Sequence, residues 1–324
     1  MQIGVPQKNI LTYGPEGQLH YRDLPQIADM IADLFAWHKA PVKPGSELSR
    51  ILKAARDLGR RADIPLDISV DPQTLFDAHC CARLAASILA LDFRPRYRQF
   101  FSDLQNGNLN FWNSEQSKAK DTEWELFLWS CLNRNMPNSA ELLEPDILLH
   151  LPFRCIGIAC KRAYSEGSVA RQIEAGERQI RAGRIPGIVA ISLDFIVDKE
   201  QSIYSHITTE NVETLQHGTI DFFERIWQKI GPKISKKYLR KGRLLGLIFG
   251  LQSYVAFRDK PNSFIELIAM RFQNDVAGPN FSTQVMNYIH QALSMNSSGG
   301  LAGNFIAARL DSLKSLRPPM ETSV

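Results

Sequence analysis

Residues 141–162, with the sequence ELLEPDILLHLPFRCIGIACKR, contain the feature that decides the fold. Two apolar segments, 141–151 and 153–162, are separated by a single residue, so an antiparallel hairpin is the simplest arrangement. Side chains two apart on a strand share a face, which would group Glu144, Asp146, Leu148 and His150, and, on the second strand, Cys155, Gly157, Ala159 and Lys161. The pattern predicts that Asp146 and Lys161 lie side by side at a sheet edge, where a surface ion pair is the alternative interpretation.

The segments around this hairpin alternate between helical and strand patterns. Apolar spacing predicts a helix over 121–134, then the hairpin, a helix over 168–182 and a buried strand over 187–197. A further helix is predicted over 211–230, with strands over 244–257 and 263–272. This order predicts an α/β fold with a layered sheet, and it excludes a second helical bundle.

The first hundred residues have a different pattern. Helical spacing recurs over 24–37, 47–61 and 72–91. A polar stretch, 105–120, follows. We therefore expect an α-helical N-terminal module over 1–105, a core over 121–275 and a C-terminal helical tail over 276–324, flexible after Ser297.

Composition excludes several classes of protein. Of the 324 residues, 44% are hydrophobic and 22% charged, which is typical of globular rather than disordered chains. The net charge of +4 is only a weak hint of a polyanionic partner. The start of the chain lacks a signal-peptide pattern, the 244–257 apolar run is too short to cross a bilayer, and the five cysteines lack CxxC spacing and lie among apolar neighbours. We expect a cytoplasmic protein in a reducing compartment, with no membrane partner.

The helix over 121–134 carries an acid on its apolar side. Glu125 lies on one stripe with Leu128, Trp129 and Leu132, so it should point toward the core. A buried glutamate needs a cation or a hydrogen-bond donor, and a divalent metal ion or Lys161 could meet it. Glu123 lies about 160° away on the helical wheel, so we expect it to be solvated.

These residues resemble the PD-(D/E)XK nuclease superfamily: a helical Glu125, then Pro145-Asp146, then a strand that ends in Ala159-Cys160-Lys161-Arg162. The resemblance covers about 121–197. It implies a restriction-endonuclease-like mixed central sheet flanked by helices and a bound Mg²⁺ or Mn²⁺. It also implies that Asp146, Glu125 and the main-chain carbonyl of Cys160 are metal ligands, that Glu125 is an auxiliary acid and that Lys161 positions or activates the attacking water.

One position departs from the family pattern. The second acid, two residues before the lysine, is Ala159 here. Another residue could replace this acid, either from the following helix or Glu144 on the strand. Without a replacement, the chain would be a non-cleaving member of the family. On the helix, Glu174 has the best sequence distance but falls about 130° from the apolar stripe, while two glutamines border that stripe. The helical candidates are Glu166, Glu174 and Glu177, together with Gln172 and Gln179, which could face the site as glutamines do in RecB-like members.

Basic residues suggest where nucleic acid would bind. A run between 229 and 243 could form a phosphate-contacting loop or a solvated connection. Its members are Lys229, Lys233, Lys236, Lys237, Arg240, Lys241 and Arg243. We predict nucleic-acid contacts from Lys236, Lys237, Arg240, Lys241 and also Arg162. Arg94, Arg96 and Arg98, interleaved with aromatic residues, could contact nucleic acid or end a helix.

The sequence thus predicts a metal-dependent nuclease that hydrolyses phosphodiester bonds, with DNA as the favoured partner, in defence against foreign DNA or in DNA processing. A non-catalytic nucleic-acid-binding protein on the same fold is the first alternative. An interaction scaffold in which the hairpin acid and lysine merely pair is the second. A homodimer would suit double-strand cutting.

Overall fold

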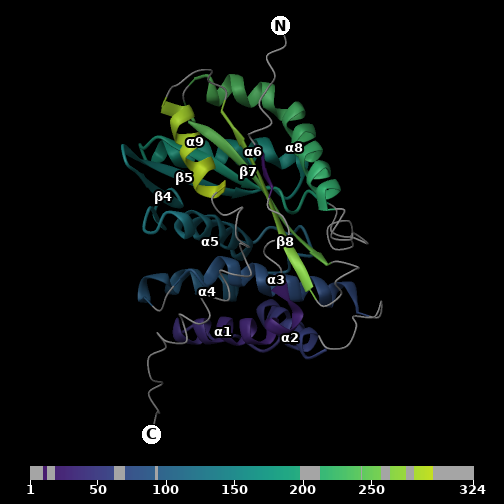
Figure 1. The fold of residues 1–324 in the computed structure, drawn as a ribbon. Helices are drawn as coiled ribbons and strands as arrows, with labels where there is room; N and C mark the ends of the chain where they lie inside the picture. The colour runs from purple at the N-terminus through teal and green to yellow at the C-terminus, as the bar shows by residue number, and fades with distance from the viewer. Residues whose placement is uncertain are drawn as a thin grey trace.

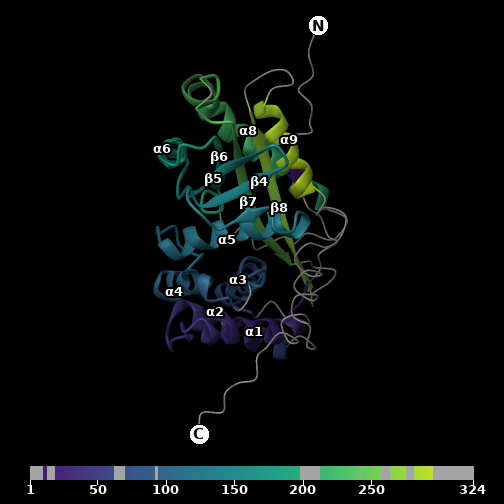
Figure 2. The same cartoon turned by 90° about the vertical axis from the view of Figure 1, so that its left-hand side faces the viewer.

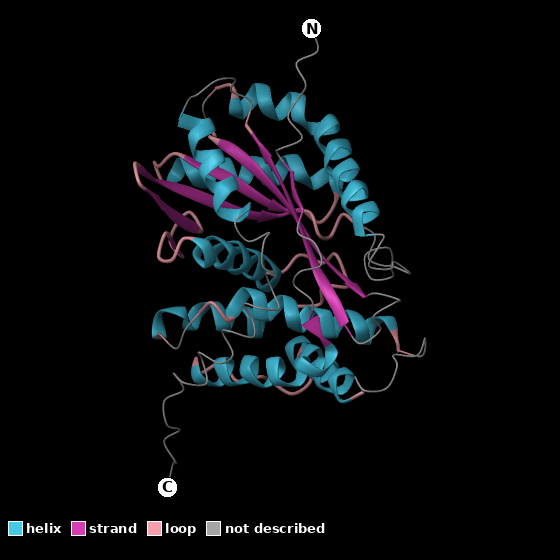
Figure 3. Ribbon diagram, viewed as in Figure 1, coloured by secondary structure: helices cyan, strands magenta, loops and turns pink. Residues whose placement is uncertain are grey.

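The structure is a computed structural model, and it describes residues 10–12, 19–61, 70–91, 94–197, 212–241, 243–256, 263–274 and 281–294. It has helices on both sides of one mixed sheet, which confirms the predicted α/β class (Figures 1 and 3). The tail beyond Ser297 lies outside the described residues. No helix in the described ranges combines the length and the apolar character that crossing a membrane requires.

The central sheet has the strand order β1-β8-β7-β6-β5-β4-β3, and β2 also pairs with β8. Within this sheet, the adjacent strands β5, β6 and β7 run parallel to one another, and all other neighbouring strands pair antiparallel. The strands are β1 (Ile10–Thr12), β2 (Leu19–His20), β3 (Ala140–Glu141), β4 (Ile147–Leu151), β5 (Arg154–Arg162), β6 (Gly187–Ser192), β7 (Gly246–Ala256) and β8 (Ser263–Gln273). The predicted hairpin is β4–β5, with Leu148 opposite Gly157 and His150 opposite Cys155. The first predicted strand is interrupted, because Asp146 lies in the connection just before β4.

Two pairs of helices cover the two faces of the sheet (Figure 2). One face packs against α5 (Lys118–Asn135) and α9 (Phe281–Ser294), and the other against α6 (Val169–Ala182) and α8 (Val212–Ile234). The alternation along β5 explains this, because Ile158 and Cys160 belong to the apolar cluster on the first face and Ala159 to the cluster on the second.

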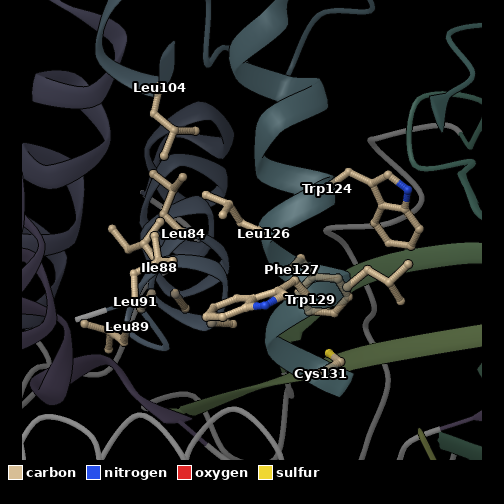
Figure 4. Packing of buried hydrophobic residues seen from close by; sticks show 14 of the residues in the cluster. Leu84, Ile88, Leu89, Leu91, Leu104, Trp124, Leu126, Phe127, Trp129 and Cys131 are labelled. Atoms are coloured by element: carbon tan, nitrogen blue, oxygen red, sulfur yellow. The ribbon is translucent and has the colours of Figure 1, made fainter. Parts of the chain in front are cut away.

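The N-terminal helices form a further layer beneath α5 (Figure 1). They are α1 (Leu24–Trp37), α2 (Glu47–Arg60), α3 (Pro72–Ile88) and α4 (Arg98–Asn106), and the first three confirm the predicted helices. Leucine and isoleucine side chains of α3 and α4 meet Leu126 and Trp129 of α5 (Figure 4). The helix α5 therefore has a buried side toward the N-terminal layer as well as one toward the sheet.

The N-terminal layer and the sheet share one hydrophobic core. At the start of β8, the ring of Phe264 lies 5.0 Å from that of Tyr21 and 4.5 Å from that of His79, measured between centroids. The strands β1 and β2 also belong to the sheet, although they precede α1. The polar stretch 105–120 is consequently not a break in the core.

Candidate active site

Asp146 owes its position to close packing between the connection before β4 and strand β5. Pro145 is buried against Gly157, and a Cβ atom at residue 157 would lie only 2.7 Å from Pro145 Cγ and 2.8 Å from Ile185 Cδ1. A side chain there would force these atoms apart. The missing side chain of Gly157 thus lets the connection lie flat on β5 and brings Asp146 next to the end of that strand.

Three hydrogen bonds hold the Asp146 carboxylate. Its Oδ2 accepts one from the main-chain N–H of Cys160 at 2.7 Å and one from Lys161 Nζ at 3.2 Å. Its Oδ1 accepts one from Gln179 Nε2, on α6, at 2.7 Å. The predicted proximity of Asp146 and Lys161 is confirmed. Burial raises the pKa of Asp146, and the positive charge of Lys161 opposes this rise.

Glu125, on α5, lies close enough to Asp146 and Lys161 to interact with their charges. It therefore points toward the sheet, as its position on the apolar stripe of the helix predicts. Burial raises its pKa to about 8, and the negative charges of Asp146 and Glu144 add to the rise while Lys161 opposes it. Burial also raises the pKa of the Cys160 thiol, again assisted by the charges of Asp146 and Glu125. Glu125, Asp146 and Cys160 therefore form one electrostatic neighbourhood at the end of β5.

This neighbourhood suits a hard cation. Lys161 Nζ donates to Asp146 Oδ2 and, at 2.9 Å, to the main-chain oxygen of Cys160, so its ammonium group bridges two oxygens that the resemblance assigns to a metal ion. Burial is the main cause of the raised pKa of Glu125, so a cation beside this carboxylate would favour its charged form. The candidate metal ligands are the carboxylates of Asp146 and Glu125 and the main-chain carbonyl of Cys160. Within the described residues, no group of three or more His, Cys, Asp or Glu side chains is arranged to hold a metal ion. The oxygen chemistry fits Mg²⁺ or Mn²⁺, with few protein ligands.

The second acid of the family pattern is replaced by Ala159, on β5. Ala159 is fully buried in the apolar cluster beneath α6. Glu174 instead pairs with Arg178 at 3.7 Å and with Lys237 at 3.5 Å, and Glu166 pairs with Lys229 at 2.8 Å. These ion pairs engage both carboxylates away from Asp146.

Of the two candidate glutamines on α6, the structure brings Gln179 to Asp146. The Gln179 amide also donates to the main-chain oxygen of Pro145, so it holds two consecutive residues of the connection. Gln172 lies two turns earlier on α6 and is half-buried, and Glu177 is buried. Exposed Glu144 acts on the site through its charge, which raises the pKa of both Asp146 and Glu125.

Two predictions about charged residues are wrong. Glu123, expected in solvent, is fully buried, because α5 lies between the sheet and the N-terminal helices. Arg162, expected to contact nucleic acid, is buried at the end of β5 and donates to Glu123 Oε2 at 2.8 Å. Glu123 also accepts from Arg83 of α3 at 2.9 Å. Arg162 therefore contributes to the core and not to a surface.

The cluster of Arg83, Glu123, Arg162 and Asp194 was missed by sequence reasoning. Asp194 Oδ2 lies 2.5 Å from Arg83 Nη2 and 3.9 Å from Arg162 Nη2. Burial opposes the ionisation of Asp194, but the two arginines together hold its pKa below the usual value. An acid inside the predicted buried strand 187–197 was the available signal, because a charge at such a place needs partners. This cluster, hereafter the buried charge cluster, joins α3, α5 and the ends of β5 and β6.

The basic run is helical, which corrects the expectation of a loop. The helix α8 continues through Pro232 to Ile234, and a π-helical turn, Ser235–Leu239, follows. Near-helical spacing leaves five basic side chains exposed on one side, hereafter the basic stripe: Lys233, Lys236, Lys237, Arg240 and Lys241. The Lys237–Glu174 pair places this stripe beside α6, the helix that also carries Gln179.

The cysteines are all free, and four of them are buried as expected. Cys155 departs from the expectation because it is exposed, with its Sγ 3.2 Å from His150 Nδ1 across the hairpin.

Comparisons with models of protein families, with curated proteins and with solved structures found no match to this chain.

Proposed function

We propose that this protein is a metal-dependent nuclease that hydrolyses phosphodiester bonds in DNA and has a restriction-endonuclease-like core. The observation that carries the proposal is the grouping of Asp146, Lys161 and Gln179 at the end of β5, with Glu125 facing them from α5. Four side chains from the β4 connection, β5, α6 and α5 converge there, which a surface ion pair between two strands would not require. The free cysteines support the expectation of a cytoplasmic location.

Each residue has a definite chemical task in this proposal. Asp146, Glu125 and the Cys160 carbonyl would hold Mg²⁺ or Mn²⁺, which when bound polarises a phosphate and makes a bound water more acidic. Lys161 would turn its ammonium group toward the attacking water and the phosphate, where it stabilises developing negative charge. Gln179 would fix the orientation of Asp146 through its 2.7 Å hydrogen bond. The basic stripe would contact the phosphates of the bound strand.

A non-catalytic nucleic-acid-binding protein is the second candidate. The observation in its favour is Ala159, which is buried among apolar residues and leaves the candidate metal site with one carboxylate fewer than the family pattern. The basic stripe would serve both functions equally.

A cleavage assay separates the two. Purified wild type would be incubated with Mg²⁺, Mn²⁺ or EDTA and with single-stranded, duplex and branched DNA and RNA. We expect metal-dependent cleavage of DNA by the wild type, none by Asp146→Asn, and none by Lys161→Ala, which should still bind the metal. Asp57→Asn, which alters an exposed ion pair on α2, is the matched control and should cleave normally. Full metal-dependent turnover by Asp146→Asn would overturn the proposal, and binding without any cleavage by the wild type would favour the second candidate.

A further inference from the structure

A pocket of about 710 Å³ lies between the turn before α4, the second half of α5 and the connection around β3. It is hereafter the arginine pocket, because Arg94, Arg96 and Arg134 line it and the only acid in its lining is Glu141. Tyr97 and Trp129 form part of its wall. Figure 4 shows the side chain of Trp129 extending from α5. Its volume falls in the range of small-molecule sites, and the excess positive charge favours an anionic ligand.

Tyr97 holds two of these arginines together. Its hydroxyl accepts a hydrogen bond from Arg96 Nη2 at 2.6 Å and one from Arg94 Nη2 at 3.3 Å. The guanidinium carbons lie 4.8 Å and 5.5 Å from the centre of the tyrosine ring. Both arginines are exposed while Tyr97 is buried, so a rigid base carries two adjacent cationic groups at the surface. Paired guanidinium groups match the geometry of a phosphate group.

The lining of the pocket suits an unpaired nucleotide better than a base-paired one. Leu143, at the rim, is a large apolar side chain with 51% of its surface exposed, and Phe100 is half-exposed beside the arginines. Apolar and aromatic surface next to cationic groups suits an unpaired base and its phosphate, because bases stack on such surfaces. A paired base would have its faces covered by its neighbours in the duplex.

The arginine pocket is close to the candidate active site along two elements. Trp129 is one turn beyond Glu125 on the same stripe of α5, about 6 Å along the helix axis. Leu143 precedes Asp146 by three residues, so their Cα atoms are at most about 11 Å apart. Trp129 Nε1 donates to the main-chain oxygen of Ala140 at 2.9 Å, so this stripe faces the connection that leads to Asp146. One strand can therefore reach both places.

We propose that the arginine pocket binds an unpaired nucleotide of the strand that carries the scissile phosphate, so that the substrate class is DNA with a single-stranded segment, such as an overhang or a flap. The placement next to a scissile bond rests on the proposed nuclease function. Binding of the nucleotide does not, and it can be measured without cleavage.

Binding would be measured by fluorescence anisotropy in the Asp146→Asn background, with labelled overhang and blunt-duplex DNA. The test variant is Arg94→Gln/Arg96→Gln, and the matched control is Arg22→Gln/Arg60→Gln, which removes two exposed arginines outside the pocket. We expect the test variant to weaken overhang binding by about tenfold and blunt-duplex binding by about twofold or less. The control should change both by about twofold or less. Leu143→Glu, which adds a negative charge at an exposed rim position, should reproduce the selective loss.

Several outcomes would overturn the proposal. Equal losses on overhang and blunt DNA would mean that the arginines act only through general electrostatic attraction. Unchanged overhang binding would exclude the pocket from the interface. If dAMP or inorganic phosphate bound the wild type as tightly as the overhang DNA, the pocket would be a site for a small anion and not for a strand.

Cleavage in the wild-type background distinguishes failure of this proposal from failure of the nuclease proposal. If the wild type cleaves overhang DNA and Arg94→Gln/Arg96→Gln cleaves it equally well, the pocket proposal is wrong and the nuclease proposal stands. If the wild type cleaves nothing but the anisotropy differences are found, the pocket is a nucleic-acid site on a non-catalytic protein.

Discussion

Gln179 on α6 donates a 2.7 Å hydrogen bond to Asp146 Oδ1, and no other hydrogen bond to this oxygen is found within the described residues. The same amide reaches the main-chain oxygen of Pro145. Because Oδ2 is held by Cys160 N and Lys161 Nζ, Gln179 determines the rotation of the carboxylate about its own axis. The orientation of the predicted metal ligand thus depends on a helix that follows it by more than twenty residues.

The first prediction concerns this contact. Gln179→Ala should lower metal-dependent cleavage by about 10- to 100-fold with the fold retained, because partners that orient a metal ligand typically contribute that much. Gln172→Ala, the same change on the same helix two turns away, is the control and should leave cleavage nearly unchanged. Initial rates at saturating Mg²⁺ measure the effect. Equal activity of the two variants would exclude Gln179 from the site.

Glu125 leads to a prediction about pH and stability. Its pKa of about 8 lies above the ordinary value of 4.5, so the metal-free folded protein keeps a proton that the unfolded chain loses between these pH values. Folded protein is therefore progressively disfavoured as the pH rises from 4.5 to 8, and the effect levels off above 8. Glu125→Gln, which cannot titrate, should lack this contribution. Thermal unfolding midpoints in EDTA across that range measure it, and identical pH slopes for the two proteins would contradict it.

The same proton should be coupled to metal binding. A cation bound by the Glu125 carboxylate displaces the proton, so the apparent Mg²⁺ affinity should rise by up to about tenfold per pH unit below pH 8 and then level off. Titration calorimetry in two buffers of different ionisation enthalpy detects the released proton. Mg²⁺ affinity that does not change with pH would remove Glu125 from the ligand set.

Ala159 allows a direct test of the missing acid. Ala159→Glu places a carboxylate on the strand face that Lys161 shares, and we expect tighter Mg²⁺ dependence of cleavage. The enlarged side chain must also enter a filled apolar cluster, so the metal-free variant should lose about 1–3 kcal/mol of unfolding free energy. Ala159→Gln, of the same size without the charge, separates the two effects. If both variants show the same Mg²⁺ dependence, the position adjoins no metal site.

The basic stripe should determine the salt dependence of nucleic-acid binding. Replacing Lys236, Lys237 and Arg240 with Gln should weaken binding to all sequences alike and reduce the slope of log affinity against log salt by about 0.9 for each lost duplex phosphate contact. The control replaces Lys53, Arg60 and Arg61, which are exposed on and just after α2. Both variants lose three charges, so an equal effect of the two would show that only net charge matters.

The elements around the hairpin could be predicted from the sequence because their apolar residues either recur with a clear period or form a continuous run, as in the fully buried strand β6. The proximity of Asp146 and Lys161 was predicted from the strand period, with a surface ion pair as the alternative interpretation, although Asp146 lies in the connection before β4. The environment of α5 could not be predicted from the sequence. A helical wheel assumes that a helix has one buried side, whereas α5 has two. Glu123 was misplaced for this reason. Arg162 was misplaced because the acids that make its burial tolerable, Glu123 of α5 and Asp194 after β6, are far away in sequence. The strands β1 and β2 have three and two residues, too few to show a period.

The last prediction tests the buried charge cluster. Glu123 neutralises Arg83 and Arg162, both almost fully buried, and its Oε1 also accepts a 2.9 Å hydrogen bond from Ser87. Glu123→Gln keeps the volume but removes the charge, which leaves Asp194 as the acid facing two buried arginines in this cluster. We expect a loss of about 3–5 kcal/mol in unfolding free energy, measured by urea denaturation, because an uncompensated buried charge is far more costly than a lost surface pair. Glu174→Gln, which removes the acid of an exposed ion pair, should cost less than about 1 kcal/mol. Equal losses for the two variants would mean that the cluster does not hold the N-terminal helices to the sheet.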